Sequence, residues 1–186
     1  CRMHQKIIIL DFGSQYTQLI ARRIRELNVY CEIHPWNKIP TMDSAVAGVI
    51  LSGSPFSVLD ENSPNPDLSQ IKGKLPLLGV CFGAQFLSHN FGGEVLPSST
   101  REYGRALLSK VNSSEVISKG MTVGSQVWMS HGDTIKSVPD HYTVFASTED
   151  VEVAGYVING ESTYGVQFHP EVYHSTEGKV LIKNYI

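Results

Sequence analysis

Cys81 has the clearest chemical setting in the sequence, because it stands at the centre of the segment 79–83, GVCFG. An apolar run over residues 75–80 leads into it, and helical spacing follows over residues 82–91. A glycine two residues before and two after a nucleophile, between a strand and a helix, is the pattern of a nucleophile elbow. The helix N-terminus favours a thiolate there, and the Phe82 N–H can donate to an oxyanion. The alternative is an ordinary buried cysteine.

A cysteine nucleophile needs a base, and His169 is the candidate. It follows the alternating run of residues 164–168 and precedes Pro170 and Glu171. Proline biases the residue before it toward an extended backbone, in which side chains two positions apart point the same way. Glu171 would then hold the imidazole in one tautomer while His169 exchanges a proton with Cys81. The alternative is a loop histidine beside a solvated glutamate.

The first half of the chain alternates strand-like and helix-like segments that would carry these residues. Strands are expected at residues 7–11, 29–33, 46–51 and 75–80, and helices at residues 15–27 and 82–91. Continuous apolar runs are typical of strands buried on both faces of a parallel sheet. The order of elements predicts an α/β fold with a doubly wound, mostly parallel sheet and flanking helices.

The second half has a different pattern, with short β-prone pieces over residues 95–127 and strand-like runs at 144–146, 151–157 and 164–168. Helical spacing returns only at residues 176–186. We expect this half to add antiparallel strands at the edge of the sheet and to close with a helix. Residues 1–186 together are expected to form one domain.

Composition excludes several classes of protein. Fifteen basic and eighteen acidic residues give a net charge of −3, which argues against a nucleic-acid-binding surface. No apolar run approaches the ~20 residues of a membrane span, and the first residues do not resemble a signal peptide. Three widely spaced cysteines favour reduced thiols and a cytoplasmic location. The chain begins without Met and ends in a helix-like stretch, so we expect a piece of a longer protein.

The elbow, with a His-Pro-Glu triplet 88 residues after its cysteine, resembles the class I glutamine amidotransferases over residues 6–186. Four further segments resemble one branch of that family, in which the amidotransferase domain serves an ATP-dependent synthetase. These segments are 11–16 (DFGSQY), 51–55 (LSGSP), 101–104 (REYG) and 130–133 (SHGD). The resemblance implies a flavodoxin-like amidotransferase fold.

The resemblance also implies roles for the residues around the elbow. Cys81 would be the nucleophile, His169 the base and Glu171 the residue that orients the base. The oxyanion hole would use the backbone N–H groups of Phe82 and Ser54. The family usually has glycine at the position of Ser54, so the serine fits only if its backbone does not require a positive φ.

Five further residues match family positions that contact the glutamine substrate. Gly53 lies in the oxyanion loop, and Gln85 lies one turn after the elbow. Ser130, His131 and Asp133 match the segment that receives the α-amino and α-carboxylate groups. A carboxylate such as that of Asp133 is a suitable partner for an ammonium group.

The function implied is hydrolysis of glutamine to glutamate and ammonia through a thioester. The domain would need no cofactor or metal, while the synthetase partner, fused or separate, would use ATP and Mg²⁺. No Gly-rich pyrophosphate loop occurs in the chain, so it would be the N-terminal part of a longer synthetase or one of two subunits, with a homodimer possible through the partner. Three alternatives remain: an amidotransferase for anthranilate or carbamoyl phosphate synthesis, a γ-glutamyl hydrolase, and a non-catalytic binding module.

The remaining basic residues have less specific interpretations. Arg22, Arg23 and Arg25 form either a solvated helix face or a docking surface. The spacing of His169 and His174 does not match the usual zinc patterns. The other histidines are expected to be surface or packing residues: His4, His34, His89, His141 and His174.

Overall fold

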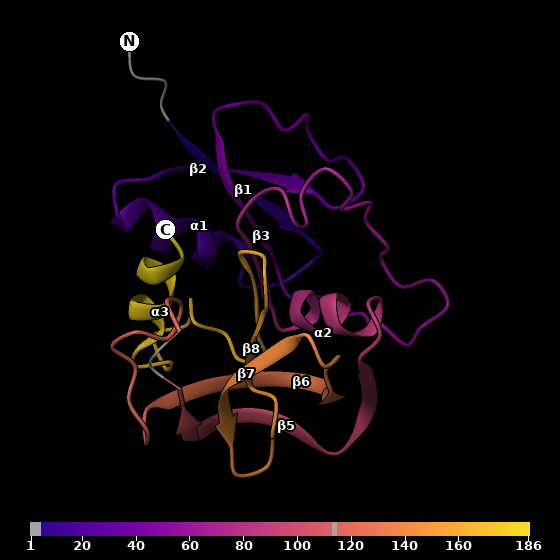
Figure 1. Cartoon of the computed structure of the whole chain (residues 1–186), viewed down its shortest axis with the longest axis vertical. Helices are drawn as coiled ribbons and strands as arrows, with labels where there is room; N and C mark the ends of the chain where they lie inside the picture. The colour runs from indigo at the N-terminus through magenta and orange to yellow at the C-terminus, as the bar shows by residue number, and fades with distance from the viewer. Residues whose placement is uncertain (1–4, 113–114) are drawn as a thin grey trace.

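The computed structural model describes residues 5–112 and 115–186, without the side chains of residues 98–103, 131 and 132. Nine strands form one sheet in the order β2-β1-β3-β4-β9-β8-β7-β5-β6. Figure 1 shows α1 and α3 on one side of this sheet and α2 on the other. The α/β class with a mostly parallel core and an antiparallel edge is confirmed.

The parallel part of the sheet carries helices on both faces. Its first four strands are β1 (Lys6–Asp11), β2 (Tyr30–Pro35), β3 (Val46–Leu51) and β4 (Leu77–Val80). Successive residues of β1 point to opposite faces. Ile7 and Ile9 pack with residues of α1 (Thr17–Glu26) and α3 (Gly178–Tyr185), whereas Ile8 and Leu10 pack with residues of α2 (Phe82–His89). Burial against two cores explains why β1, β3 and β4 are nearly continuous apolar runs.

The antiparallel part consists of β8 (Gly155–Ile158), β7 (Tyr142–Thr148), β5 (Glu94–Val111) and β6 (Gln126–Ser137). Residues 95–127, expected to form short β pieces, instead contribute one long strand and the start of another. The expected strand at 151–157 is wrong in extent, since its strand begins only at Gly155. Residues 151–154 precede the strand although Val151, Val153 and Ala154 are buried apolar residues.

The strand β9 (Thr163–Val166) differs most from expectation, because it lies inside the sheet rather than at its edge. It pairs parallel with β4, with Gly79 opposite Gly165 and Val80 opposite Val166, and antiparallel with β8. Parallel neighbours end at the same edge of a sheet, so the chain after β9 emerges beside Cys81. Local sequence patterns do not specify such pairing, since it joins segments more than 80 residues apart.

The three helices are shorter than the sequence pattern indicated. The α1 helix begins at Thr17, and the Ser14 hydroxyl accepts a 3.0 Å hydrogen bond from the Tyr16 N–H just before it. The α3 helix begins at Gly178, where a Cβ would lie 2.0 Å from the Pro170 carbonyl oxygen. Within residues 5–112 and 115–186, no helix is long and apolar enough to cross a membrane.

Candidate active site

Cys81 occupies a strained turn between β4 and α2. Its φ of 53° and ψ of −102° lie in a region that side-chain-bearing residues avoid, and among the described non-glycine residues only Asn28 shares a positive φ. Strain of this kind persists only when the surroundings impose it, and it clusters at functional sites.

The two glycines of the elbow are required by close packing. A Cβ on Gly79 would lie 2.6 Å from the backbone carbon of Gly83, and a Cβ on Gly83 would lie 2.7 Å from the Cβ of Leu51. Neither contact can be relieved by rotating a flexible side chain. The sequence pattern around Cys81 is therefore explained by the approach of α2 to β4 and β3.

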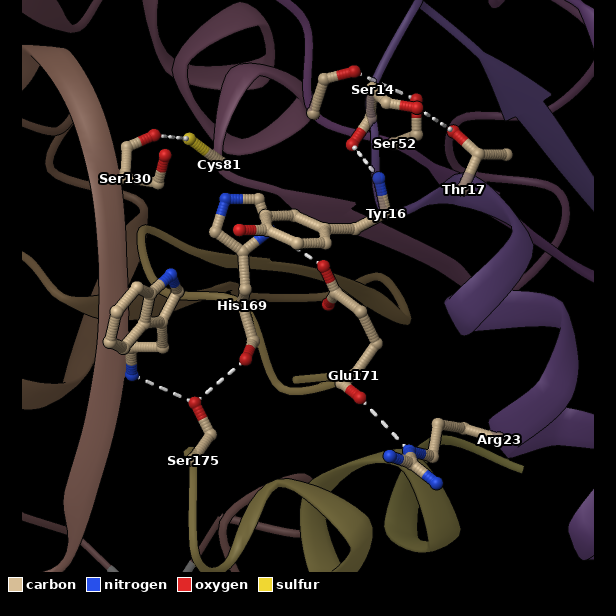
Figure 2. A network of polar contacts seen from close by, with 12 residues as sticks. Ser14, Tyr16, Thr17, Arg23, Ser52, Cys81, Ser130, His169, Glu171 and Ser175 are labelled. Carbon is tan, nitrogen blue, oxygen red and sulfur yellow. Dashed lines mark hydrogen bonds and ion pairs between the residues drawn. The ribbon is translucent and has the colours of Figure 1, made fainter. Parts of the chain in front are cut away.

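The Cys81 thiol faces β6 and is nearly buried. Its Sγ lies 3.4 Å from the Ser130 carbonyl oxygen, to which it donates (Figure 2). The other described free cysteine, Cys31, donates to the Ala21 carbonyl inside the core. Burial raises the pKa of the Cys31 thiol, and nearby Arg25 only partly offsets this effect. Cys31 is therefore an unreactive structural thiol.

His169 and Glu171 form a buried pair directly after β9. The His169 Nδ1 lies 2.6 Å from the Glu171 Oε1, and the two side chains are 4% and 1% exposed. They meet as expected, but not through an extended backbone: the chain turns at Pro170, and the Val172 N–H donates to the His169 carbonyl. Pro170 biases the backbone of His169 toward an extended conformation, but this bias does not determine the conformation of the residues after the proline.

The electrostatic setting of His169 favours the imidazolium. Burial lowers its pKa, but the negative charge of Glu171 and hydrogen bonding to Cys81 and Glu171 together raise the pKa well above the usual range. A protonated His169 is the form that stabilises a neighbouring thiolate and donates a proton to a leaving group.

Gly53, in the loop after β3, lies beside both catalytic candidates. A Cβ at this residue would lie 3.2 Å from the His169 Cε1 and 3.7 Å from the Cys81 Cβ. The next residue, Ser54, is not among the described residues with positive φ, so serine fits its backbone. Its hydroxyl accepts a 3.1 Å hydrogen bond from the Phe56 N–H. The second oxyanion candidate, Phe82, is the first residue of α2.

The remaining expected substrate contacts lie between α2 and β6. Gln85 donates through Nε2 to the Asp133 carbonyl at 3.1 Å, and the Ser57 hydroxyl donates to the Asp133 carboxylate. Ser130 is adjacent to Cys81 through its carbonyl. The side chain of His131 lies outside the described residues.

Gln167 is a site residue that the sequence analysis missed. It is fully buried, and its Oε1 accepts from the Gln85 Nε2 at 3.5 Å and from the Ile135 N–H at 3.3 Å. It thus connects β6 and α2 at the chain leaving β9. A polar residue between two apolar ones, two positions before the histidine, was the available sequence signal.

Two residues at α1 were also missed as neighbours of the catalytic pair. The Tyr16 ring lies 5.0 Å from the His169 ring at an angle of 64°, and Figure 2 shows it beside the imidazole. The Arg23 Nε donates to the Glu171 carbonyl at 2.9 Å. For Arg23, the expectation of a solvated or docking face is therefore wrong, whereas Arg22 and Arg25 are exposed.

No group of three or more potential metal ligands occurs among the described residues. The His174 ring packs against Trp128, with 4.6 Å between ring centroids at an angle of 30°, and against Tyr173, with 3.9 Å at 40°.

Comparisons with known sequences agree with this geometry. The model of the family "Glutamine amidotransferase class-I" matches residues 8–186. Proteins named GMP synthase (glutamine-hydrolyzing) from Cytophaga hutchinsonii, Flavobacterium psychrophilum and Bacteroides fragilis are 61%, 58% and 56% identical to the chain, each over 99% of its length. The chain spans 36% of the length of these curated relatives.

Solved structures give the same assignment of fold. A putative GMP synthase subunit from Thermoplasma acidophilum superposes with a TM-score of 0.83 at 29% identity, covering 100% of this chain and 94% of that one. A glutamine amidotransferase from Thermotoga maritima has a TM-score of 0.78 at 19% identity, covering 98% of this chain and 95% of that one, which supports the fold alone. The chain belongs to the class I glutamine amidotransferase family.

Proposed function

We propose that this chain hydrolyses glutamine to glutamate and ammonia, and that the ammonia is used by an ATP-dependent synthetase part to convert XMP into GMP, a step of purine biosynthesis. The observation that carries the first half is Cys81 on a strained elbow beside the buried His169–Glu171 pair. Support for the second half is the high identity to proteins named GMP synthase.

In the first step, the Cys81 thiolate attacks the side-chain amide carbon of glutamine. A C–S bond forms, and the carbonyl oxygen becomes an oxyanion that accepts hydrogen bonds from the N–H groups of Phe82 and Ser54. His169 then donates its proton to the amide nitrogen, the C–N bond breaks, and ammonia leaves. The product is a γ-glutamyl thioester at Cys81.

In the second step, neutral His169 takes a proton from water, which attacks the thioester carbonyl. The C–S bond breaks, glutamate leaves, and the Cys81 thiolate and His169 imidazolium are restored. Glu171 keeps the Nδ1–H of the imidazole in place in both steps, so that Nε2 is the nitrogen that exchanges protons.

Substrate recognition is assigned to the groups gathered beside the elbow. Asp133 provides a carboxylate for the α-ammonium group, which would replace the Ser57 hydroxyl as its hydrogen-bond donor. Gln85 is oriented by Asp133 and Gln167, and Gly53 leaves room for the reacting amide beside His169 and Cys81. Ser130 and His131 complete the proposed contacts.

The synthetase part is proposed from the length of the relatives, since the chain spans 36% of them. Residues 1–186 would form the amidotransferase domain, and ATP and Mg²⁺ would bind the synthetase part, either fused or as a separate subunit. The unpaired Cys31 and Cys81 thiols support a reducing, cytoplasmic setting.

A two-stage assay tests this proposal. The chain alone should release glutamate from glutamine without ATP, and Cys81→Ala should not. When the synthetase part of the Cytophaga hutchinsonii relative is added with ATP, Mg²⁺ and XMP, glutamine should support GMP formation. Glutamate release without GMP formation, combined with anthranilate formation by an anthranilate synthase partner, would instead favour another amidotransferase pathway.

A further inference from the structure

The turn that carries His169 and Glu171 is held at several backbone positions. The His169 N–H donates to the Trp128 carbonyl at 2.9 Å, and its carbonyl accepts from the Ser175 hydroxyl at 2.7 Å. Ser175 in turn accepts from the Trp128 N–H at 2.9 Å. These contacts fix the histidine end of the turn to β6 (Figure 2).

The glutamate end of the turn is held by α1. The Arg23 Nε donates to the Glu171 carbonyl at 2.9 Å, across 148 positions of sequence. The same guanidinium contacts the Glu26 carboxylate through Nη1 at 2.9 Å, and the Arg23 side chain is only 14% exposed. Contacts at Nε and Nη1 thereby fix the Arg23 guanidinium, with its Nε–H directed at the turn that carries His169 and Glu171.

The carboxylate of Glu171 needs this support, because its own contacts are few. Its Oε1 binds the His169 Nδ1, but its Oε2 is buried and has no hydrogen-bond partner among the described residues. With one oxygen held only by the imidazole that it must orient, the position of the carboxylate depends on the backbone of Glu171.

The geometry points to Arg23 as a positioning residue that holds the Glu171 backbone so that its carboxylate stays aligned with His169, an inference that rests on the proposed function. Tyr16, which immediately precedes α1, packs against the His169 ring. The segment from Tyr16 to Arg23 would thus support both members of the pair.

Arg23→Gln tests this role, because glutamine is shorter and loses the fork that contacts two partners at once. Misplacement of a catalytic group by about 1 Å costs on the order of 10²-fold in rate. We expect kcat for glutamine hydrolysis to fall by about that factor, with KM changed by less than about threefold, because the Arg23 guanidinium contacts Glu171 and Glu26 rather than the residues proposed to bind glutamine. Arg23→Lys should recover part of the loss.

Two matched controls come from the same helix. Arg22→Gln removes an exposed arginine one residue away and should leave kcat unchanged. Glu26→Gln removes the surface ion pair but leaves the Arg23 Nε contact, so its effect on kcat should be much smaller than that of Arg23→Gln. All variants are first compared with the unmodified chain by circular dichroism and thermal unfolding.

Alkylation of Cys81 by iodoacetamide provides a readout that a purely structural role would not produce. A displaced Glu171 supports the His169 imidazolium less well, so near pH ~6.5 His169 activates the Cys81 sulfur less for attack on iodoacetamide. Above pH ~9.5 an ordinary cysteine, with a pKa near 8.5, ionises without help. Arg23→Gln should therefore slow alkylation at the lower pH and not at the higher one.

The inference is overturned if Arg23→Gln leaves kcat and the lower-pH alkylation rate unchanged, or if it alters alkylation equally at both pH values. Because iodoacetamide does not require glutamine binding, this arm remains informative if the unmodified chain fails to hydrolyse glutamine. That failure would contradict the proposed function, whereas a selective loss of alkylation at lower pH would still support the positioning role.

Discussion

Cys81 and Cys31 are both buried thiols, yet their surroundings assign them different chemistry. Cys81 sits at a helix N-terminus on a positive-φ turn and neighbours the His169–Glu171 pair, whereas Cys31 donates to a carbonyl of α1. Reactivity in cysteines follows such electrostatic environments rather than burial alone. The difference can be tested by treating the two positions in parallel.

Cys81→Ala and Cys81→Ser should each lower glutamine hydrolysis by roughly 10⁴-fold or more, since no other group replaces the nucleophile. Both variants should keep the fold, as judged by circular dichroism and gel filtration. Cys31→Ala is the control, and it should retain hydrolysis with a modest loss of stability. Near-normal hydrolysis by either Cys81 variant would remove its assignment as the nucleophile.

His169 and Glu171 should differ in how much their loss costs. In the proposed mechanism His169 exchanges protons with the reacting atoms and Glu171 only orients it, so His169→Ala should cost roughly 10- to 100-fold more in kcat than Glu171→Gln. Steady-state glutamate release measures both, and His141→Ala serves as an exposed histidine control. Small and equal effects would mean that the catalytic proton travels by another route.

The raised pKa of His169 predicts how stability depends on pH. Burial lowers this pKa, but the Glu171 charge and hydrogen bonds with Cys81 and Glu171 more than compensate. Protonated His169 therefore stabilises the folded chain fully below its unfolded pKa, about 6.5, and this stabilisation is lost as pH rises through the elevated folded value.

Urea unfolding at about pH 6 and about pH 9 measures that dependence, with Cys81→Ala as the background so that only the contribution of Glu171 to His169 is compared. The stability difference between this background and its Glu171→Gln derivative should be larger at the lower pH. A difference that stays constant, or grows with pH, is incompatible with a charged His169–Glu171 pair.

At the scale of elements, the elbow depends on how closely α2 approaches β4 and β3. A methyl group on Gly79 or Gly83 would overlap backbone or Cβ atoms rather than movable side-chain ends. Adding volume to a packed site of this kind costs about 1–3 kcal/mol or more. The strain at Cys81 is maintained by this packing, so the glycines support both stability and reactivity.

Gly79→Ala and Gly83→Ala should each lower the free energy of unfolding by about 3 kcal/mol and slow alkylation of Cys81. Gly124→Ala is the matched control, because its Cβ would meet no atom within 4 Å and only its φ of +90° opposes substitution. It should cost about 1–2 kcal/mol and leave Cys81 alkylation unchanged. The elbow argument fails if all three variants behave alike.

Local patterns in the sequence were sufficient to predict most elements and the position of Cys81 between β4 and α2. The apolar runs that became β1, β3 and β4 and the spacing that became α2 are short-range properties of the chain. The interior position of β9 and the inward direction of Arg23 could not be predicted in this way. Both depend on contacts between residues more than 80 positions apart.

The turn at Pro170 shows a second limit of sequence reasoning. The sequence analysis expected His169 and Glu171 to pair because an extended backbone would point both side chains the same way. They do pair, but the segment turns instead of remaining extended. The packing of Gly178 against the Pro170 carbonyl and the bond from Ser175 to the His169 carbonyl shape this turn. These contacts involve residues six and eight positions apart, which the spacing of His169 and Glu171 does not encode.

At the scale of the whole molecule, the site forms where the two halves of the sheet meet. Cys81 follows β4 of the parallel half, His169 follows β9, and β6 closes the site through Ser130. Because the proposed triad is assembled from distant segments, its reactivity should require the folded chain. Unfolding in urea should therefore abolish any selective reactivity of Cys81 over Cys31.

Labelling with a glutamine analogue that carries an alkylating group in place of the carboxamide tests the central claim most directly. Intact-mass measurement and peptide mapping of the folded chain should find one label, on Cys81, and L-glutamine should slow its formation. His169→Ala should slow it as well. No labelling, labelling that glutamine does not slow, or labelling at Cys31 instead would contradict the assignment of Cys81 as a glutamine-directed nucleophile.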